Sequence, residues 1–165
     1  MATEEALKLH FMRRAIELSR RAAATGDGEA FGSVIVRDDK IIGEGWNHIK
    51  VRHDPTAHGE VEAIRNTCSA LKTLHLTGAE IYTNCEPCIM CAAVIQYAGI
   101  VKIYYGTTTD DISPHFEDEA GCVDVKAVAD DLRKATNQRR IPAEQLLPGE
   151  AIKVFDEFHP KKTKS

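Results

Sequence analysis

The sequence lacks any run of apolar residues that approaches the roughly 18 needed for a helix to cross a membrane. It also lacks the basic and apolar regions of a secretion signal, because two acidic residues, Glu4 and Glu5, stand near its start. No internal repeat and no low-complexity segment is present. We therefore expect a cytoplasmic protein without a membrane partner.

Positive charge is not in excess. The 21 Lys and Arg residues are outnumbered by 25 Asp and Glu residues, so the formal net charge is −4 at pH 7. Basic pairs such as Arg13-Arg14 and Arg20-Arg21 are accounted for by helix surfaces. Because no overall basic field attracts phosphate groups, we do not expect a nucleic-acid partner.

Length and composition instead fit one folded domain. The chain has 165 residues, of which 43% are hydrophobic and 28% are charged. A chain of this size buries enough apolar surface for a sizeable core. We therefore predict a single domain over residues 1–165.

Cysteine is scarce, and its number is odd. The five cysteines stand at positions 68, 85, 88, 91 and 122 of a chain that has no secretion signal. Such a set argues against a framework of disulfides, which is typical of small secreted domains. Metal binding is the better explanation for the close spacing of Cys85, Cys88 and Cys91.

Hydrophobic periodicity and turn residues divide the chain into alternating helices and strands. The expected helices cover residues 7–24, 58–71, 87–98, 123–135 and 150–158. The expected strands cover residues 31–37, 40–45, 79–83 and 101–105, the first two as a hairpin. A hairpin followed by alternating helices and strands predicts an α/β fold, a three-layer α/β/α sandwich with a mixed central sheet.

Two short motifs contain the residue types of a metal site. His58-Gly59-Glu60 begins one predicted helix, and Pro87-Cys88-Ile89-Met90-Cys91 begins the next. Zinc prefers imidazole and thiolate, and a Cys-x-x-Cys pair at a helix start places both sulfurs on one side of the first turn. One histidine and two cysteines leave one position of a tetrahedral ion for water, as in catalytic zinc sites.

Three closely spaced cysteines compete for the metal. Pro87 places Cys85 at the end of the preceding strand, whereas Cys88 and Cys91 lie at the helix start. We therefore predict His58, Cys88 and Cys91 as the zinc ligands. Two other interpretations stay open: a structural zinc site with a fourth ligand, and a redox-active dithiol. The candidates for a fourth ligand are Cys85, His53 and Cys122.

Glu60 stands two residues after the predicted histidine ligand. A carboxylate beside the metal, but not bound to it, can take a proton from the attacking water and deliver it to a substrate nitrogen or a leaving amine. We therefore predict Glu60 as the catalytic residue, and we expect its pKa to rise when substrate excludes water.

Both motifs resemble those of the cytidine and deoxycytidylate deaminase superfamily, whose zinc deaminases combine His-x-Glu with Pro-Cys-x-x-Cys. The resemblance runs from Phe31 to about Asp118, and within the superfamily it is strongest to bacterial guanine deaminases. It is carried by the segments 31–36, 44–47, 54–61 and 85–91. The resemblance implies a cytidine-deaminase-like fold, the same three ligands for one zinc ion per subunit, and Glu60 as the proton shuttle.

The resemblance also implies which residues contact the substrate. Asn47 would bind the base, and Phe31 would help line the pocket. The segment 115–118 is similar to a Gly-Phe-Asp-Asp segment of guanine deaminases, which makes Asp118 a predicted contact and Glu117 its alternative. A solvated surface loop is the other explanation for these acidic residues.

The implied reaction is zinc-dependent hydrolytic deamination of a nucleobase or nucleoside, with guanine converted to xanthine and ammonia. Cytosine, guanosine and related aminated heterocycles are the alternative substrates, because one loop can change a pocket. Gly59 departs from the alanine of guanine deaminases and resembles fungal cytosine deaminases at this position. A transfer RNA adenosine deaminase would need a basic surface, and a non-catalytic zinc-binding module would release no ammonia.

The resemblance finally implies an arrangement for the C-terminal tail, residues from about 142 to 165. Phe155 and Phe158 make the last predicted helix apolar enough to cover a pocket. In the resembled family such a tail is exchanged between two subunits. We therefore predict a homodimer in which the tail covers the active site or is swapped between subunits.

Overall fold

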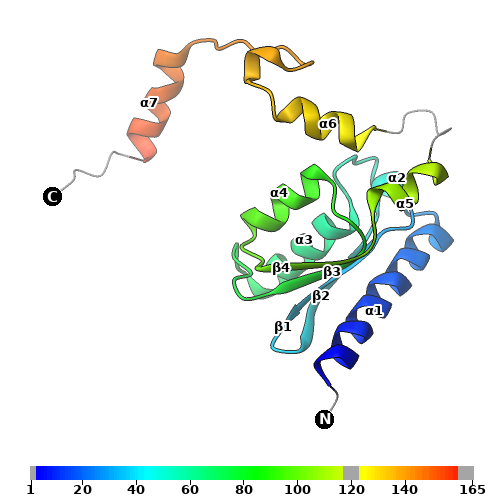
Figure 1. Cartoon of the computed structure of the whole chain (residues 1–165). Coiled ribbons are helices and arrows are strands. Elements are labelled where there is room, and N and C mark those ends of the chain that lie inside the picture. Colours follow the sequence, from blue (N-terminus) through cyan, green and yellow to red (C-terminus); the bar gives the residue numbers. More distant parts are fainter. Residues whose placement is uncertain (1–2, 117–122, 160–165) are drawn as a thin grey trace. The chain divides into compact units, whose positions relative to one another are not determined.

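A sheet of four strands forms the centre of the fold in the computed structural model, which describes residues 3–116 and 123–159 (Figure 1). The strands are β1 (Gly32–Arg37), β2 (Lys40–Trp46), β3 (Glu80–Cys85) and β4 (Lys102–Thr107), in the order β2-β1-β3-β4. β1 is antiparallel to β2 and β3, whereas β3 and β4 are parallel. The predicted mixed sheet is confirmed.

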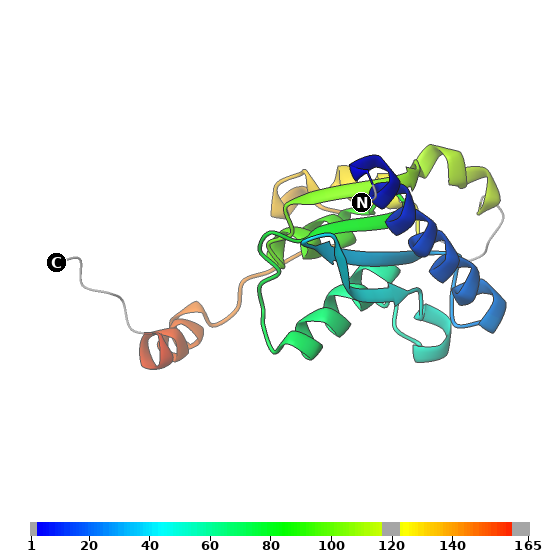
Figure 2. The same ribbon diagram turned by 90° about the horizontal axis from the view of Figure 1, so that it is seen from below.

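Helices cover both faces of this sheet. The helical elements of the N-terminal part are α1 (Glu4–Thr25), α2 (Ile49–Arg52), α3 (Gly59–Leu71), α4 (Ile89–Tyr97), α5 (Thr109–Ile112) and the 3-10 helix η1 (Ser113–His115). α1 lies on one face, and α3 and α4 lie on the other (Figure 1, Figure 2). The predicted three-layer α/β/α sandwich is confirmed. None of the described helices combines the length and the apolar character that a membrane span requires.

The core has one half on each side of the sheet, because successive side chains of a strand point to opposite faces. Along β1, Val34 and Val36 pack with Phe11 of α1. Ile35, which lies between them, packs with Ala63 of α3 on the opposite face. All of these side chains are buried. This packing holds β1 between α1 and α3, and it therefore positions the start of α3 relative to the sheet.

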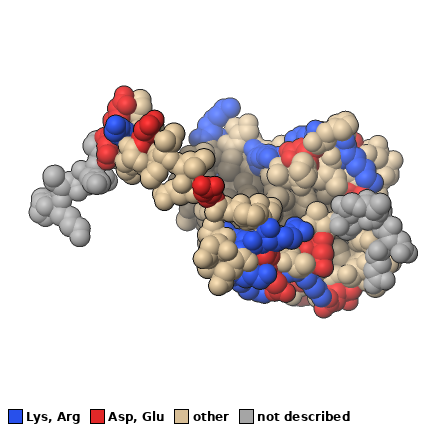
Figure 3. Space-filling view, turned by 90° about the horizontal axis from the view of Figure 1, so that it is seen from above, with Lys and Arg blue, Asp and Glu red and all other residues tan. Residues whose placement is uncertain are grey.

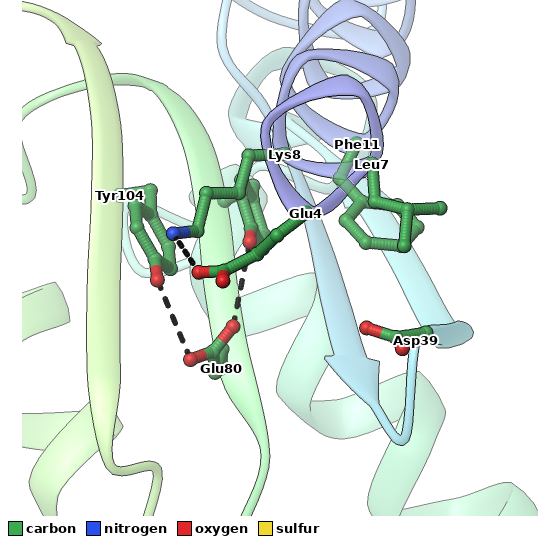
Figure 4. Close-up of a pocket in the computed structure, with 8 residues that line it drawn as sticks. Glu4, Leu7, Lys8, Phe11, Asp39, Glu80 and Tyr104 are labelled. Carbon is green, nitrogen blue, oxygen red and sulfur yellow. Dashed lines mark hydrogen bonds and ion pairs between the residues drawn. The ribbon is translucent and has the colours of Figure 1, made fainter. Parts of the chain in front are cut away.

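A small cavity of about 180 Å³ lies where the start of α1 meets the sheet (Figure 4). The rings of Tyr82 and Tyr104 stack there with their centroids 4.4 Å apart, and their hydroxyls donate to Glu80 at 3.4 and 3.5 Å. Burial raises the pKa of the Tyr82 hydroxyl, so the hydroxyl keeps its proton and donates it. Glu80 begins β3 and Cys85 ends it, so this cavity lies at the end of β3 opposite the cysteine motif.

The chain divides into two compact units, Met1–Val123 and Asp124–Ser165. The second unit contains α6 (Val125–Leu132), the 3-10 helix η2 (Thr136–Gln138) and α7 (Pro148–Phe158). Both predicted C-terminal helices are present, with bounds that differ by a few residues. Asp124 directly precedes α6 as its N-cap, and its carboxylate accepts hydrogen bonds from two backbone N–H groups of the first turn. α7 carries exposed apolar side chains, among them Phe155 and Phe158.

Candidate functional site

The two sequence motifs meet at one point in the structure. His58 and Cys88 directly precede α3 and α4, and neither side chain caps its helix. The His58 Nδ1 atom lies 3.8 Å from the Cys88 Sγ atom and 3.6 Å from the Cys91 Sγ atom. All three ligand atoms lie within 4.8 Å of one another. Side chains that are 30 and 33 positions apart in the sequence therefore form one cluster.

The cluster has the spacing of a zinc site. A tetrahedral zinc ion, with Zn–N and Zn–S bonds of about 2.0 and 2.3 Å, holds its nitrogen and sulfur ligands about 3.6 Å apart. The observed nitrogen–sulfur distances of 3.6 and 3.8 Å agree with this separation. Three protein ligands are the number found in catalytic zinc sites, where the remaining position takes water or substrate. The residues therefore fit a zinc ion.

A hydrogen bond couples the two sulfurs of the cluster. A hydrogen bond from the Cys91 thiol, helped by His58, lowers the pKa of Cys88 to about 4. The same contact raises the pKa of the Cys91 thiol, which keeps its proton. The negative charge on Cys88 in turn raises the pKa of His58. These opposite shifts favour the thiolate at Cys88 and the thiol at Cys91, and zinc binding would require both as thiolates.

Glu60 lies in the first turn of α3, two residues after His58, and is only 6% exposed. Burial raises the pKa of its carboxyl above the ordinary value, and the nearby His58 opposes this shift. A carboxyl with a raised pKa holds a proton more readily, which suits a group that must accept a proton and later deliver it. Among the described residues, the cluster of ligand atoms does not include Glu60. Glu60 is therefore placed to move protons beside a metal.

Asn47 directly follows β2, and only 1% of its surface is exposed. Its Oδ1 atom accepts hydrogen bonds from the backbone N–H groups of Glu29 and Ile49, at 3.2 and 3.1 Å. Because only the carbonyl oxygen of the amide can accept both bonds, they assign its orientation. The Nδ2 group is therefore the end of this side chain that can donate a hydrogen bond to a substrate.

Gly28 supports the position of Asn47, which sequence reasoning missed. A Cβ atom on Gly28 would lie 2.0 Å from the Asn47 Oδ1 atom, far inside contact distance. Only glycine therefore lets the Asn47 amide lie against the backbone at residue 28. In the sequence, Gly28 belongs to a run that predicts a turn after the first helix. No signal in that run shows that residue 47 packs against it.

Phe31 lies beside Asn47, because its backbone carbonyl accepts a hydrogen bond from the Asn47 N–H at 2.9 Å. Its ring stacks on that of Phe116, with the centroids 6.1 Å apart and the planes at 19°. The predicted contact Asp118 and its alternative Glu117 lie outside the described residues. The described part of the chain thus joins Phe31 to Asn47, while Asp118 stays a prediction.

The glycine between the histidine ligand and Glu60 brings α3 close to the start of β1. A Cβ atom on Gly59 would lie 3.2 Å from both the Gly32 Cα atom and the Phe31 carbonyl oxygen. These separations are tighter than ordinary van der Waals contact. Gly59 therefore accommodates a closer approach of the two backbones than an alanine would.

Two of the three candidates for a fourth zinc ligand, Cys85 and His53, do not join the cluster. Cys85 is buried, and this burial raises the pKa of its thiol. His53 is exposed at the end of α2. Neither residue belongs to the group of ligand atoms found within residues 3–116 and 123–159. Cys122 lies outside the described residues.

Comparison with known proteins assigns the family. Residues 6–107, which include both motifs, match the family model of the cytidine and deoxycytidylate deaminase zinc-binding region. The chain belongs to this deaminase family. It is therefore a zinc-dependent hydrolytic deaminase, and the cluster of one histidine and two cysteines is suited to hold its metal ion.

Relatives of this deaminase are similar over nearly the whole chain. It is 37% identical to the guanine deaminase of Bacillus subtilis (strain 168) over 145 residues, which cover 88% of this chain and 89% of that relative. It is 30% identical to the tRNA-specific adenosine deaminase of Aquifex aeolicus (strain VF5) over 154 residues, which cover 93% and 95%. The X-ray structure of guanine deaminase from Bacillus subtilis matches with a TM-score of 0.83 and 32% identity, covering 99% of this chain and 98% of that chain.

Proposed function

We propose that this deaminase converts guanine and water to xanthine and ammonia. The observation that carries the proposal is the 37% identity to the Bacillus subtilis guanine deaminase, which extends over 88% of this chain. The structural match with a TM-score of 0.83 supports it. The tRNA-specific relative from Aquifex aeolicus is less similar, with 30% identity over a comparable share of the chain.

The distribution of charge also favours a small substrate over RNA. The formal net charge of the chain is −4 at pH 7. On the face shown in Figure 3, Lys and Arg side chains are interspersed with Asp and Glu side chains. An RNA substrate is attracted by clustered positive charge, because its phosphates carry the negative charge that the protein must neutralise. A free base has no such requirement.

Asn47 and Phe31 would bind the base. The Asn47 Oδ1 atom is engaged by two backbone N–H groups, so its Nδ2 group would donate to a ring nitrogen or a carbonyl oxygen of guanine. The Phe31 ring, which stacks on Phe116, offers an aromatic surface to a flat ring. We retain Asp118 as the contact for the amino group of the purine.

Glu60 would move the protons of the reaction. Zinc, when bound by His58, Cys88 and Cys91, supplies Lewis-acid activation of the attacking water. Glu60 would take one proton from this water and deliver it to the ring nitrogen beside the carbon that carries the amine. It would then pass the second proton of the water to the amine. The carbon–nitrogen bond breaks, ammonia leaves and a carbonyl forms, so one water is consumed and Glu60 returns to its starting state.

Ammonia release from a panel of bases tests the proposed function. The panel contains guanine, guanosine, cytosine, adenine, isocytosine and ammeline, together with a transfer RNA substrate. We expect guanine to give the highest kcat/KM, with one xanthine formed for each ammonia, and zinc-stripped enzyme to be inactive. A preference for another member of the panel would contradict guanine as the substrate. No ammonia from any member would contradict catalysis itself.

We also propose a homodimer in which the tail, residues from about 142 to 165, covers the active site or is exchanged between subunits. β4 is an edge strand of the sheet among the described residues, and apolar side chains such as Ile103 and Tyr105 are exposed along it. α7 likewise exposes Phe155 and Phe158. Exposed apolar surface on both units favours association with a second chain. Light scattering should give twice the chain mass of 18.2 kDa, and a monomeric mass would contradict the dimer.

We propose the cytoplasm as the location of this deaminase. The zinc cluster requires two cysteines in the reduced state, Cys88 and Cys91. Cytoplasmic reductants keep thiols reduced, whereas oxidising compartments favour disulfides. The proposed substrate is also a free base, which needs no membrane partner.

A further inference from the structure

The carboxylate of Glu62 is the centre of an ion-pair cluster on α3. Its side chain has no exposed surface. The Arg52 Nη1 atom lies 2.6 Å from its Oε2 atom, and the Arg65 Nη1 atom lies 2.9 Å from its Oε1 atom. The His48 Nδ1 atom lies 3.7 Å from the Oε2 atom. One enclosed carboxylate therefore faces three nitrogen-bearing side chains.

Two of these partners belong to the segment between β2 and α3, residues 47–58. This segment begins at Asn47, the proposed contact for the base, and ends at His58, a proposed zinc ligand. His48 directly follows Asn47, and Arg52 ends α2 in the middle of the segment. Glu62 therefore contacts the segment both near its start and at its centre.

The third partner extends the cluster toward the end of the segment. Arg65, on α3 itself, reaches past Glu62 to the Asp54 carboxylate at 3.4 Å and to the Thr56 hydroxyl at 3.2 Å. Asp54 and Thr56 directly precede the turn that leads into His58. The Glu62 cluster thus joins the start, the centre and the end of the 47–58 segment to one helix.

A carboxylate that has been removed from water is costly unless cations reach it with good geometry. Arg65 donates a hydrogen bond to the Oε1 atom, whereas Arg52 approaches the Oε2 atom as an ion pair that lacks hydrogen-bond geometry, so its hold on the carboxylate is electrostatic. The 47–58 segment is therefore held in an arrangement that lets both arginines reach Glu62. The same helix carries Glu60 in its first turn, so the arrangement defines where Asn47 lies relative to the reacting groups.

We propose that Glu62 is a positioning residue for substrate binding, which clamps the 47–58 segment to α3 and so holds Asn47 in register with His58 and Glu60. The proposal rests on the proposed function, in which Asn47 binds the base. Glu62 itself does not touch substrate. An ion cluster with a merely structural role would change stability, but it would not change how tightly the folded enzyme binds its substrate.

The variant Glu62→Gln tests the clamp, because it keeps the shape of the side chain and removes its charge. We expect KM for guanine to rise on the order of tenfold, while kcat changes by less than about threefold and zinc stays at one ion per chain. Amide hydrogen exchange of peptides from 47–58 should become about tenfold faster. Arg52→Gln should also raise KM and speed the exchange of these peptides. The double variant Glu62→Gln/Arg52→Gln should differ little from either single variant, because both substitutions remove the same Arg52–Glu62 ion pair.

Glu44→Gln is the matched control. Glu44 makes two hydrogen bonds with Arg14, at 2.7 and 2.8 Å, and it lies outside the 47–58 segment. The control therefore makes the same chemical change at a partly exposed carboxylate–arginine pair without touching the clamp. We expect its KM and the exchange of the 47–58 peptides to equal those of the wild type. If Glu62→Gln does not fold, Arg52→Gln carries the test, because Arg52 is half-exposed and its loss leaves Arg65 on Glu62.

The clamp would be overturned if Glu62→Gln and Arg52→Gln left both KM and the hydrogen exchange of the 47–58 peptides unchanged. It would also be overturned if Glu44→Gln changed KM and this exchange as much as Glu62→Gln does. Amide hydrogen exchange is measured without substrate, so it tests the clamp independently of the proposed function. A wild-type enzyme that does not deaminate guanine refutes the proposed substrate, whereas exchange that does not respond to Glu62→Gln refutes the clamp. In the first case KM is measured with the substrate that the panel identifies.

Discussion

Glu60→Gln is expected to lower kcat by about a thousandfold, while one zinc ion per chain stays bound. Glutamine keeps the size of the side chain and can still form hydrogen bonds, but it cannot take a proton from water. The structure places Glu60 beside the cluster of ligand atoms, buried and with a raised pKa, and not within the cluster itself. Proton transfer should therefore be lost without loss of the metal. The measurements are ammonia release under saturating substrate and zinc content by elemental analysis.

Glu44→Gln also serves as the control for this prediction, because it makes the same chemical change at a half-exposed carboxylate that is paired with Arg14. It should retain wild-type kcat. Turnover that survives in Glu60→Gln would show that another group moves the protons. Loss of zinc from this variant would instead assign Glu60 to the metal site.

Cys88→Ala is expected to abolish both zinc binding and turnover. Cys88 supplies one of the three ligand atoms, and its lowered pKa of about 4 favours the thiolate that zinc binds, so its removal deletes a ligand. Two remaining ligands, His58 and Cys91, do not form a catalytic zinc site, which needs three. We expect less than about a tenth of an equivalent of zinc per chain after dialysis against buffer.

Cys85→Ala is the matched control for the metal site. Cys85 is the third closely spaced cysteine, yet it does not belong to the cluster of ligand atoms among the described residues. This variant should keep its zinc and its activity. Loss of zinc from Cys85→Ala would support a structural site with three sulfurs and contradict the open catalytic site.

Thermal unfolding gives a second measurement for Cys88→Ala. A ligand that binds only the folded state stabilises it, by about 4 kcal/mol at a thousand times its dissociation constant. A chelator should therefore lower the melting temperature of the wild type and of Cys85→Ala. It should leave Cys88→Ala unchanged, because that variant has no zinc to lose.

Much of the fold could be predicted from local patterns. The helix over 7–24 and the hairpin over 31–45 appear as α1, β1 and β2, because apolar periodicity and turn residues act within a few positions of each other. α2 and α5, with four residues each, are too short for a period of 3.6 residues to be visible. The strand order and the antiparallel pairing of β1 with β3 depend on contacts between distant segments, so the local pattern contains no sign of them.

Some features of the candidate site could likewise be predicted from the sequence, and others could not. The residue types of His58, Cys88 and Cys91, and their places at helix starts, already indicate zinc chemistry, because ligand preference is a property of the side chain. The orientation of the Asn47 amide could not be predicted. It depends on the nearby Ile49 N–H group, and also on the Glu29 N–H group and the missing side chain of Gly28, which are far from it in the sequence.

The sequence by itself determined the kinds of ligand, the carboxylate proposed for proton transfer and the order of helices and strands that present them. Only the tertiary structure decided that the ligand atoms meet within 4.8 Å and that Cys85 stands apart from them. It also decided that Glu62 joins α3 to the segment carrying Asn47. The physical reason is that side-chain chemistry and helix periodicity act locally, whereas distances between remote residues follow from the packing of the whole core.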